Sequence, residues 1–139
     1  MLFTSEKKEI KDRPYQAAAL DEIRAKFRSG IKRVLLHLAT GAGKTHVFSR
    51  VAASGVKKGS NVMLVVHGVK LVDQASQRFW KEGIHHGVRQ GSHWARDDGA
   101  SVQVCSIDTI YQRRQRPPAD LIIIDEAHLG SIEYDTVVY

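Results

Sequence analysis

The chain has 139 residues, the size of a single domain, and its 42% hydrophobic and 26% charged residues are typical of a globular protein rather than a disordered one. Its 21 basic and 15 acidic residues give a formal net charge of +6, which suits a polyanionic partner such as nucleic acid but also occurs in proteins that bind none. The single cysteine, Cys105, excludes an internal disulfide, and the longest apolar run is far shorter than the roughly 20 residues of a membrane-spanning helix. We therefore expect a soluble, intracellular, cytoplasmic protein without a membrane partner.

Apolar runs alternate with segments of helical periodicity along the chain. Helices are expected at residues 15–29, 44–56, 69–82 and 108–114, and strands at residues 34–38, 62–66, 101–105 and 120–124. Runs that are apolar throughout indicate strands covered by helices on both faces. The pattern predicts an α/β fold of three layers (α/β/α) around a mostly parallel sheet, with a ligand site at the carboxyl ends of the strands.

The first motif that carries chemistry is a glycine-rich segment between an expected strand and an expected helix. Residues 38–45 are Leu-Ala-Thr-Gly-Ala-Gly-Lys-Thr, and we call them the phosphate loop. Backbone N–H groups at a helix N-terminus can hold phosphates, and the glycines let the backbone approach them. Lys44 is then expected to neutralise the β- and γ-phosphates, and the Thr45 hydroxyl to bind Mg²⁺. The residues expected to line the nucleotide here are Thr40, Gly41, Ala42, Gly43, Lys44 and Thr45. The alternative is an ordinary strand-to-helix turn.

The second motif is a strand that ends in two carboxylates. Three isoleucines precede Asp125 and Glu126, so both acids follow directly on a buried strand. Asp125 is expected to hold Mg²⁺, and Glu126 to orient and deprotonate the water that attacks the γ-phosphate. The alternative is an acidic helix N-cap. The two motifs together, in this order, predict the nucleoside-triphosphate site of a nucleotide-driven motor domain.

These motifs resemble those of the first RecA-like domain of superfamily 2 helicases and translocases, over nearly the whole chain. The phosphate loop is similar to motif I, with leucine where the usual motif has glycine, and residues 125–128 are similar to motif II in its DEAH spelling. The resemblance implies that Gln16, with Arg13 as a weaker partner, recognises adenine, and that His128 couples the ATP site to the rest of the motor. It implies ATP and Mg²⁺ as cofactors. The most similar branch joins restriction-enzyme motor subunits and DNA-repair helicases.

Two weaker resemblances concern nucleic acid. Residues 66–74 resemble motif Ia, with Lys70 as the candidate phosphate contact where the family usually has an Arg-Glu pair, and residues 105–110 resemble the next phosphate-contacting motif, with Ser106 or Thr109 as hydroxyl donors. The family branch favours DNA over RNA. The alternative for both segments is an ordinary strand-to-helix junction.

The resemblance predicts an ATP-driven DNA translocase or helicase domain at residues 1–139, truncated and without the second RecA-like domain of the family. That domain supplies an arginine finger and is expected in cis or in trans; alone, the chain is expected to bind ATP and hydrolyse it very slowly. One alternative is a stand-alone nucleotide-binding regulatory module or decoy with little turnover. Another is a P-loop nucleotide kinase, which would leave Gln16 and the acidic motif unexplained.

The other conspicuous side chains are expected to be structural. Trp80 and Trp94 are able to stack on bases, but packing in the core or within a loop is favoured for both. Cys105 is expected in the core. Three histidines lack the spacing of metal ligands and are expected in a solvated loop: His85, His86 and His93. Three arginines are expected on a solvated face: Arg113, Arg114 and Arg116.

Overall fold

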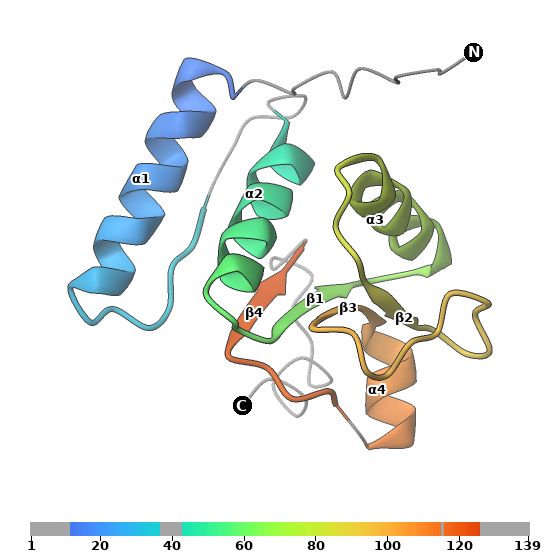
Figure 1. Ribbon diagram of the computed structural model, residues 1–139. Coiled ribbons are helices and arrows are strands. Elements are labelled where there is room, and N and C mark those ends of the chain that lie inside the picture. The colour runs from blue at the N-terminus through green and yellow to red at the C-terminus, as the bar shows by residue number, and fades with distance from the viewer. Residues whose placement is uncertain (1–11, 37–42, 115, 126–139) are drawn as a thin grey trace, which may run out of the picture. The chain divides into compact units, whose positions relative to one another are not determined.

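The computed structural model describes residues 12–36, 43–114 and 116–125 (Figure 1). The chain divides into two compact units, one that ends at Val47 and one that begins at Phe48. The elements within the described ranges are α1 (Pro14–Arg28), α2 (Lys44–Lys57), β1 (Val62–Val66), α3 (Val69–Lys81), β2 (Gly87–Arg89), β3 (Val102–Ser106), α4 (Ile107–Arg113) and β4 (Leu121–Ile124). None of the helices in these ranges is long and apolar enough to cross a membrane.

Helix α1 begins and ends where the sequence places its start and stop signals. Pro14 occupies the first helical position, where its missing N–H leaves no helical hydrogen bond unmade. After Ser29 the helix closes with two reversed hydrogen bonds, from Gly30 N–H to the Phe27 carbonyl (3.1 Å) and from Ile31 N–H to the Lys26 carbonyl (3.1 Å). The predicted helix is therefore confirmed to within one residue at each end.

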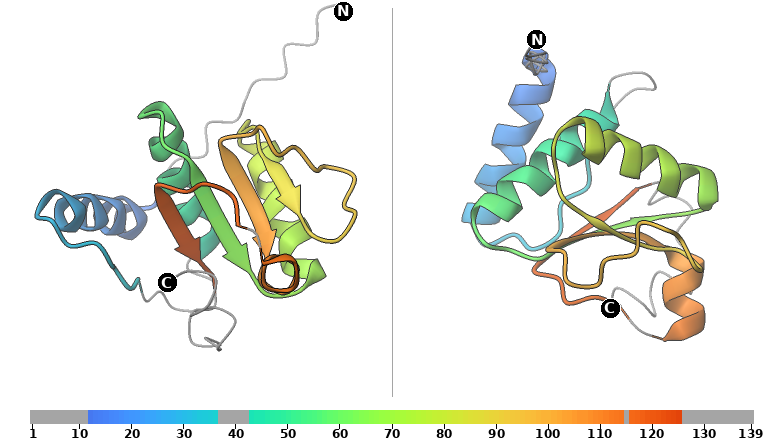
Figure 2. Two further views of the ribbon diagram at one scale, coloured as in Figure 1. Left: turned by 90° about the horizontal axis from the view of Figure 1, so that it is seen from below. Right: turned by 45° about the vertical axis from the view of Figure 1, so that its right-hand side comes forward.

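The second unit contains a sheet of four parallel strands in the order β2-β3-β1-β4. Figure 2 shows the four strands side by side and pointing the same way. Val66, the last residue of β1, lies opposite Ser106 of β3, and Val65 lies opposite Ile124 of β4. The predicted parallel sheet is confirmed, and three strands end together at one edge.

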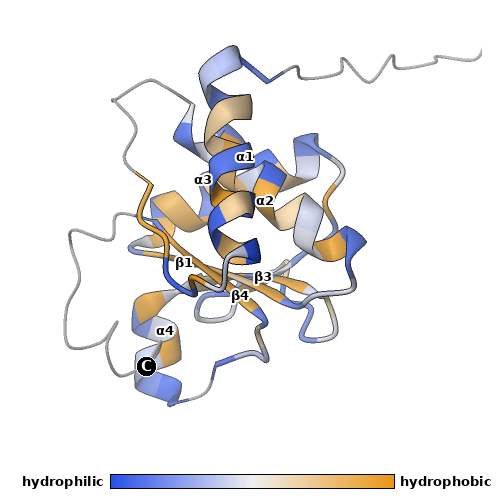
Figure 3. Ribbon diagram, turned by 90° about the vertical axis from the view of Figure 1, so that its left-hand side faces the viewer, coloured by the Kyte–Doolittle hydropathy of each residue, from blue (hydrophilic) through white to orange (hydrophobic). Residues whose placement is uncertain are grey.

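Helices of the second unit cover both faces of this sheet, which confirms the three-layer α/β/α architecture. On one face α2 and α3 pack on β1 and β3, and on the other α4 packs on the same strands. The strands of this core are largely hydrophobic in Figure 3. Burial of each large side chain contributes about 1.5–3 kcal/mol. The fully buried helix and strand residues include Phe79, Leu64 and Val72 on the first face and Met63, Val65, Cys105 and Ile107 on the second.

Cys105 is a core residue, as the sequence predicts. Its side chain is completely buried in β3. Burial raises the pKa of its thiol to about 12, because the thiolate loses its hydration there. At neutral pH the group is therefore an uncharged part of the core.

Strand β4 is the outermost of the described strands on its side and pairs only with β1. Its start is fixed at Asn61, whose N–H donates to the Asp120 carboxylate (2.8 Å) and whose carbonyl accepts from the N–H groups of Asp120 (2.8 Å) and Leu121 (3.1 Å). The isoleucines of β4 are only partly buried.

Two features differ from the sequence prediction. Residues 34–36 form no strand, because an apolar run becomes a strand only where its backbone groups pair with a neighbour; residues 37 and 38 lie outside the described ranges. Conversely, the structure adds β2 within the segment 85–100. A Cβ at Gly87 of this strand would lie 2.2 Å from the Asp97 carbonyl oxygen, so only glycine allows the loop to fold back so closely.

A buried polar group lies beside the core. His86 is only 2% exposed; its Nδ1 lies 2.9 Å from the Ile84 carbonyl oxygen and its Nε2 lies 2.7 Å from the Ser76 hydroxyl. Since a carbonyl only accepts, Nδ1 carries the proton of a neutral ring and Nε2 accepts from Ser76. Burial lowers the pKa of His86 below its ordinary value of 6.5, with smaller contributions in the same direction from His85 and His93, and the bond to Ile84 opposes them.

We expect the fold to lose stability in mild acid through His86. Because its folded pKa is depressed, the unfolded chain binds more protons, so the free energy of unfolding falls as pH drops below about 6.5. Urea denaturation at about pH 7.5 and 5.5 measures this difference. In His86→Asn, whose amide still donates to Ile84 but does not titrate, the fall should be smaller. An equal fall in both proteins would contradict the assignment.

Candidate nucleotide and nucleic-acid sites

The Gln16 side chain is held in a defined orientation at the start of α1. It is only 3% exposed, and its Oε1 accepts the backbone N–H of Arg13 at 2.9 Å. Because an N–H only donates, the oxygen of the amide must face Arg13, which turns the NH₂ group the other way. That NH₂ group lies against Gly43, where a Cβ would come within 2.3 Å of Nε2. The structure thus brings together two predicted site residues that are far apart in sequence.

The end of the phosphate loop opens helix α2. Gly43 has a φ of +76°, and its carbonyl accepts from the N–H groups of His46 (3.0 Å) and Val47 (3.3 Å). Lys44 and Thr45 are the first two residues of the helix, and both are partly exposed. The first turn of α2 contains no acidic residue, so no carboxylate within that turn offsets the partial positive charge of the helix N-terminus. Thr40, Gly41 and Ala42 lie outside the described residues.

A histidine–carboxylate pair, which sequence reasoning missed, fixes the same turn. His46 is 5% exposed, and its Nε2 lies 2.5 Å from Oδ1 of Asp12. The pair connects the first turn of α2 to the residue that precedes Arg13. The only sequence signal was a histidine directly after Lys44 and Thr45, because no periodicity relates two residues 34 positions apart.

Asp125 lies at the edge of the sheet where the strands end. Its N–H donates to the Val65 carbonyl at 3.0 Å, so its backbone extends the pairing of β4 with β1, and its side chain is partly exposed. The registers place Asp125 beside the ends of β1 and β3. A carboxylate at this edge is in the position expected of a metal ligand in an open parallel sheet. Glu126 and His128 lie outside the described residues.

The predicted nucleic-acid contacts lie at this same edge. Lys70 is exposed in the first turn of α3, directly after β1. Ser106 is the last residue of β3 and is buried, with only 4% of its surface exposed. Thr109 is partly exposed in the first turn of α4, and its hydroxyl accepts the N–H of Gly91 at 3.1 Å. Lys70 and Thr109 are therefore the more accessible of the three candidates.

The two tryptophans are exposed, so the prediction of core packing is wrong for both, whereas Trp94 does stack on His93 within its loop. Trp80 is 51% exposed and Trp94 is 82% exposed. The buried face of α3 is formed by Val72, Ala75, Ser76 and Phe79, and Trp80 is rotated by about 100° from Phe79 around the helix. Trp94 lies in the loop between β2 and β3.

His85 and His93 each pair with one carboxylate and do not converge on a common point where a metal ion could bind. Nε2 of His85 lies 3.0 Å from Asp97, and Nε2 of His93 lies 3.1 Å from Asp73. Among the described residues, no group of three or more His, Cys, Asp or Glu side chains is arranged to hold a metal ion. The three arginines of the predicted solvated face, Arg113, Arg114 and Arg116, are exposed.

Comparisons with known proteins agree on one family. The family described as Type III restriction enzyme, res subunit, matches residues 9–137. IRC3 of Saccharomyces cerevisiae, which is named as an ATP-dependent helicase, is 30% identical over 128 residues, covering 84% of this chain and 19% of that protein. The replication restart protein PriA of Synechocystis sp. is 29% identical over 115 residues, covering 75% and 14%. The chain thus spans less than a fifth of each of these relatives.

Two solved structures share the fold. The UvsW helicase from bacteriophage T4 superposes with a TM-score of 0.74 at 20% identity, covering 93% of this chain and 48% of that chain. A nuclease-deletion mutant of the Type ISP restriction-modification enzyme LlaGI, in complex with a DNA substrate mimic, gives a TM-score of 0.66 at 20% identity, covering 85% and 15%. These likenesses confirm the RecA-like P-loop fold that the sequence predicts. The match over residues 9–137 shows that this chain belongs to the family of the Type III restriction enzyme res subunit, a family of helicase-type ATPase domains.

Proposed function

We propose that this chain is the ATP-binding domain of a nucleic-acid-dependent ATPase that couples ATP hydrolysis to movement on DNA. The observation that carries the proposal is the contact between Gln16 and Gly43. An amide fixed by Arg13 presents its NH₂ group at the end of the phosphate loop, where a purine attached to the bound phosphates would meet it. The family membership and the likeness to UvsW support the same function.

In this proposal the phosphates occupy the N-terminus of α2. Backbone N–H groups of residues 40–45 and the Lys44 ammonium balance the charge of the β- and γ-phosphates. The oxygens of Thr45 and Asp125 are hard ligands that suit Mg²⁺, and both side chains are partly exposed. When bound, Mg²⁺ neutralises charge that develops on the phosphates. Glu126 orients the attacking water and accepts its proton, and His128 links the site to the rest of the motor.

Nucleic acid is proposed to bind at the carboxyl edge of the sheet in the second unit. Lys70 and Thr109 would contact phosphates there, and Ser106, at the N-cap of α4, is the less accessible hydroxyl candidate. We propose that full turnover also requires a second RecA-like domain, in cis or in trans, because an arginine finger contributes roughly 10³–10⁵ in rate in related enzymes.

Replacing Lys44 by alanine should weaken ATP-Mg binding by at least about tenfold, because a charge-assisted contact to the phosphates is lost. Titration with a fluorescent ATP analogue measures the dissociation constant. Lys57→Ala, in the last turn of the same helix, is the matched control and should bind as the unmodified chain does. Equal affinities in all three proteins would remove Lys44 from the site.

Adenine should be preferred over guanine, because the Gln16 amide can both donate to and accept from the adenine edge, whereas guanine presents only acceptors on the same edge. In Gln16→Ala both capacities are lost, so the preference should disappear. Competition of ATP and GTP against a labelled nucleotide gives the ratio of affinities, which cancels any general loss of nucleotide binding. A ratio unchanged by the substitution would contradict this role.

Nucleic-acid binding should be weak, indifferent to sequence and sensitive to salt, because the candidate contacts are to phosphates. Fluorescence anisotropy with two unrelated single strands at several salt concentrations tests this. Lys70→Ala should reduce the slope of log K against log salt by about 0.7. Lys58→Ala removes an exposed charge before β1, at the opposite edge of the sheet, and should leave the slope unchanged. Strong preference for one sequence would count against phosphate-directed binding.

A further inference from the structure

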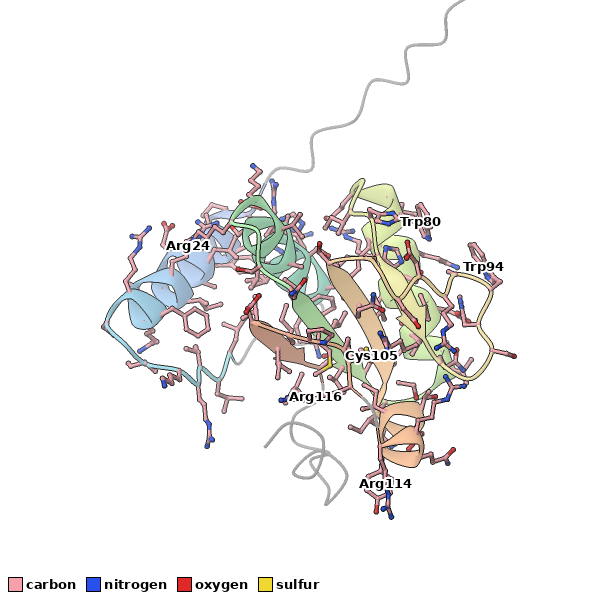
Figure 4. The ribbon with its side chains drawn as sticks, turned by 60° about the horizontal axis from the view of Figure 1, so that its bottom comes forward. Arg24, Trp80, Trp94, Cys105, Arg114 and Arg116 are labelled. Atoms are coloured by element: carbon pink, nitrogen blue, oxygen red, sulfur yellow. The ribbon has the colours of Figure 1, made fainter. Side chains whose placement is uncertain are left out.

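Both tryptophans of the chain lie beside one surface hollow. Figure 4 shows Trp80 on α3 and Trp94 on the loop after β2, on the same side of the second unit. The hollow between them has a volume of about 220 Å³. Its lining residues are Asp73, Ser76, Gln77, Trp80, His93 and Trp94.

The exposure of these indoles indicates that they bind a ligand rather than stabilise the fold. An indole is among the largest apolar groups that folding can bury, so leaving one that is 82% exposed and another that is 51% exposed forgoes much of the stabilisation available. Single exposed apolar residues need no explanation, but two aromatic rings that flank one hollow are typical of a binding surface.

The loop that carries Trp94 is held in place by its own hydrogen bonds. Nδ1 of His93 accepts the N–H of Ala95 at 3.1 Å, so Nε2 carries the ring proton and donates it to Asp73 on α3, also at 3.1 Å. The Trp94 ring stacks on His93 with a centroid separation of 5.6 Å and an angle of 26° between the planes. The indole is thus fixed before any ligand arrives, which reduces the entropy cost of binding.

Trp80 is fixed from the other side of the hollow. Its ring packs edge-on against His86, with 5.2 Å between centroids. His86 is itself held by Ser76 and by the Ile84 carbonyl. The buried neutral histidine therefore acts as a support for an exposed tryptophan.

The same loop is tied to the proposed nucleic-acid edge. Gly91 donates its N–H to Thr109 and its carbonyl accepts from Nη2 of Arg113 at 2.8 Å, both on α4. Through Asp73 the loop is also tied to α3. It therefore bridges the two helices that begin where β1 and β3 end. A strand that crossed those helix starts would therefore pass beside this loop.

The chemistry of the hollow favours a flat, neutral ring over a cation. Asp73, the carboxylate that would attract a quaternary ammonium group between two indoles, already pairs with His93. The exposed guanidinium of Arg113 lies on Gly91, three residues before Trp94, and suits a phosphate attached to the ring. The Gln77 amide in the lining both donates and accepts, so it tolerates different base edges.

We propose that Trp94, supported across the hollow by Trp80, stacks on an unpaired base of a bound nucleic-acid strand. This inference rests on the proposed function and deepens it: phosphate contacts at Lys70 and Thr109 hold the backbone, and the indole holds a base. Stacking of this kind is tolerant of sequence, because every base presents an aromatic face. The site thus selects single strands over duplex, whose bases are not free to stack.

Because Trp80 and Trp94 are the only tryptophans in the chain, tryptophan emission excited outside the tyrosine absorption band reports on this hollow alone. The chain is titrated with an oligothymidylate of about 12 nucleotides and with an abasic strand of the same length. Binding is followed by anisotropy of a label on the strand, and stacking by quenching of tryptophan emission. We expect both strands to bind and only the strand with bases to quench. Trp80→Phe should retain the quenching, which then comes from Trp94.

Affinity variants separate stacking from phosphate binding. Trp94→Ala should weaken oligothymidylate binding by about fivefold to a hundredfold without changing the slope of log K against log salt, and Trp94→Phe should restore most of the affinity. Phe27→Ala, which removes an exposed aromatic ring from α1, is the control and should have no effect.

The outcomes distinguish this inference from the proposed function. If the oligothymidylate binds by anisotropy while tryptophan emission and the affinity of Trp94→Ala are unchanged, the stacking site is wrong and nucleic-acid binding stands. Quenching by a trimethyllysine peptide and not by the oligothymidylate would assign the hollow to a protein partner and overturn the inference. If neither the oligothymidylate nor the abasic strand binds, both the stacking site and the proposed nucleic-acid binding are wrong.

Discussion

The in-register parallel pairing of β1 with β3 and β4 is the constraint on which the proposed chemistry of the second unit depends. The pairing aligns Val66 with Ser106 and Val65 with Ile124. Helices α3 and α4 therefore begin at the carboxyl edge of the sheet, and Asp125 lies at the same edge. A slip of one residue would exchange the side chains of a strand between the two core clusters, which are packed from different residues. The register is therefore specified by the fit of side chains on both faces, and the position of the polar residues at the edge follows from it.

In the first unit one side chain combines a structural role with the recognition role proposed for it. The Gln16 amide satisfies the backbone N–H of Arg13 through its oxygen, and this bond decides which way the NH₂ group points. A residue that merely capped the helix could be glutamate, and one that merely filled space beside Gly43 could be apolar. The amide meets both requirements, which is a physical reason for glutamine at this position.

How much of this the sequence predicts depends on whether the signal is local. The strands at 62–66 and 120–124 follow from short apolar runs, and the ends of α1 and α3 follow from Pro14, Gly30 and Gly83. Features made by distant residues could not be predicted. β2 is too short to show a period, and the pair of His46 with Asp12 joins segments that have no pattern in common. Core packing of Trp80 was a wrong prediction because hydrophobicity alone does not show that Phe79 and its neighbours already fill the buried face of α3.

The place of β4 in the sheet has a consequence for the carboxylate that is proposed as a metal ligand. Val62 pairs with Leu121, so the strand that delivers Asp125 joins β1 only after a long stretch of intervening chain has been closed, whereas β1 and β3 are nearer in sequence. Long-range pairings form late in folding, and an outermost strand, as β4 is among the described strands, opens most readily afterwards. Opening of β4 would withdraw the carboxylate while the clusters on β1 and β3 stay packed. The metal binding proposed for Asp125 would then depend on a sub-global state, which heat or denaturant can remove before the domain itself unfolds.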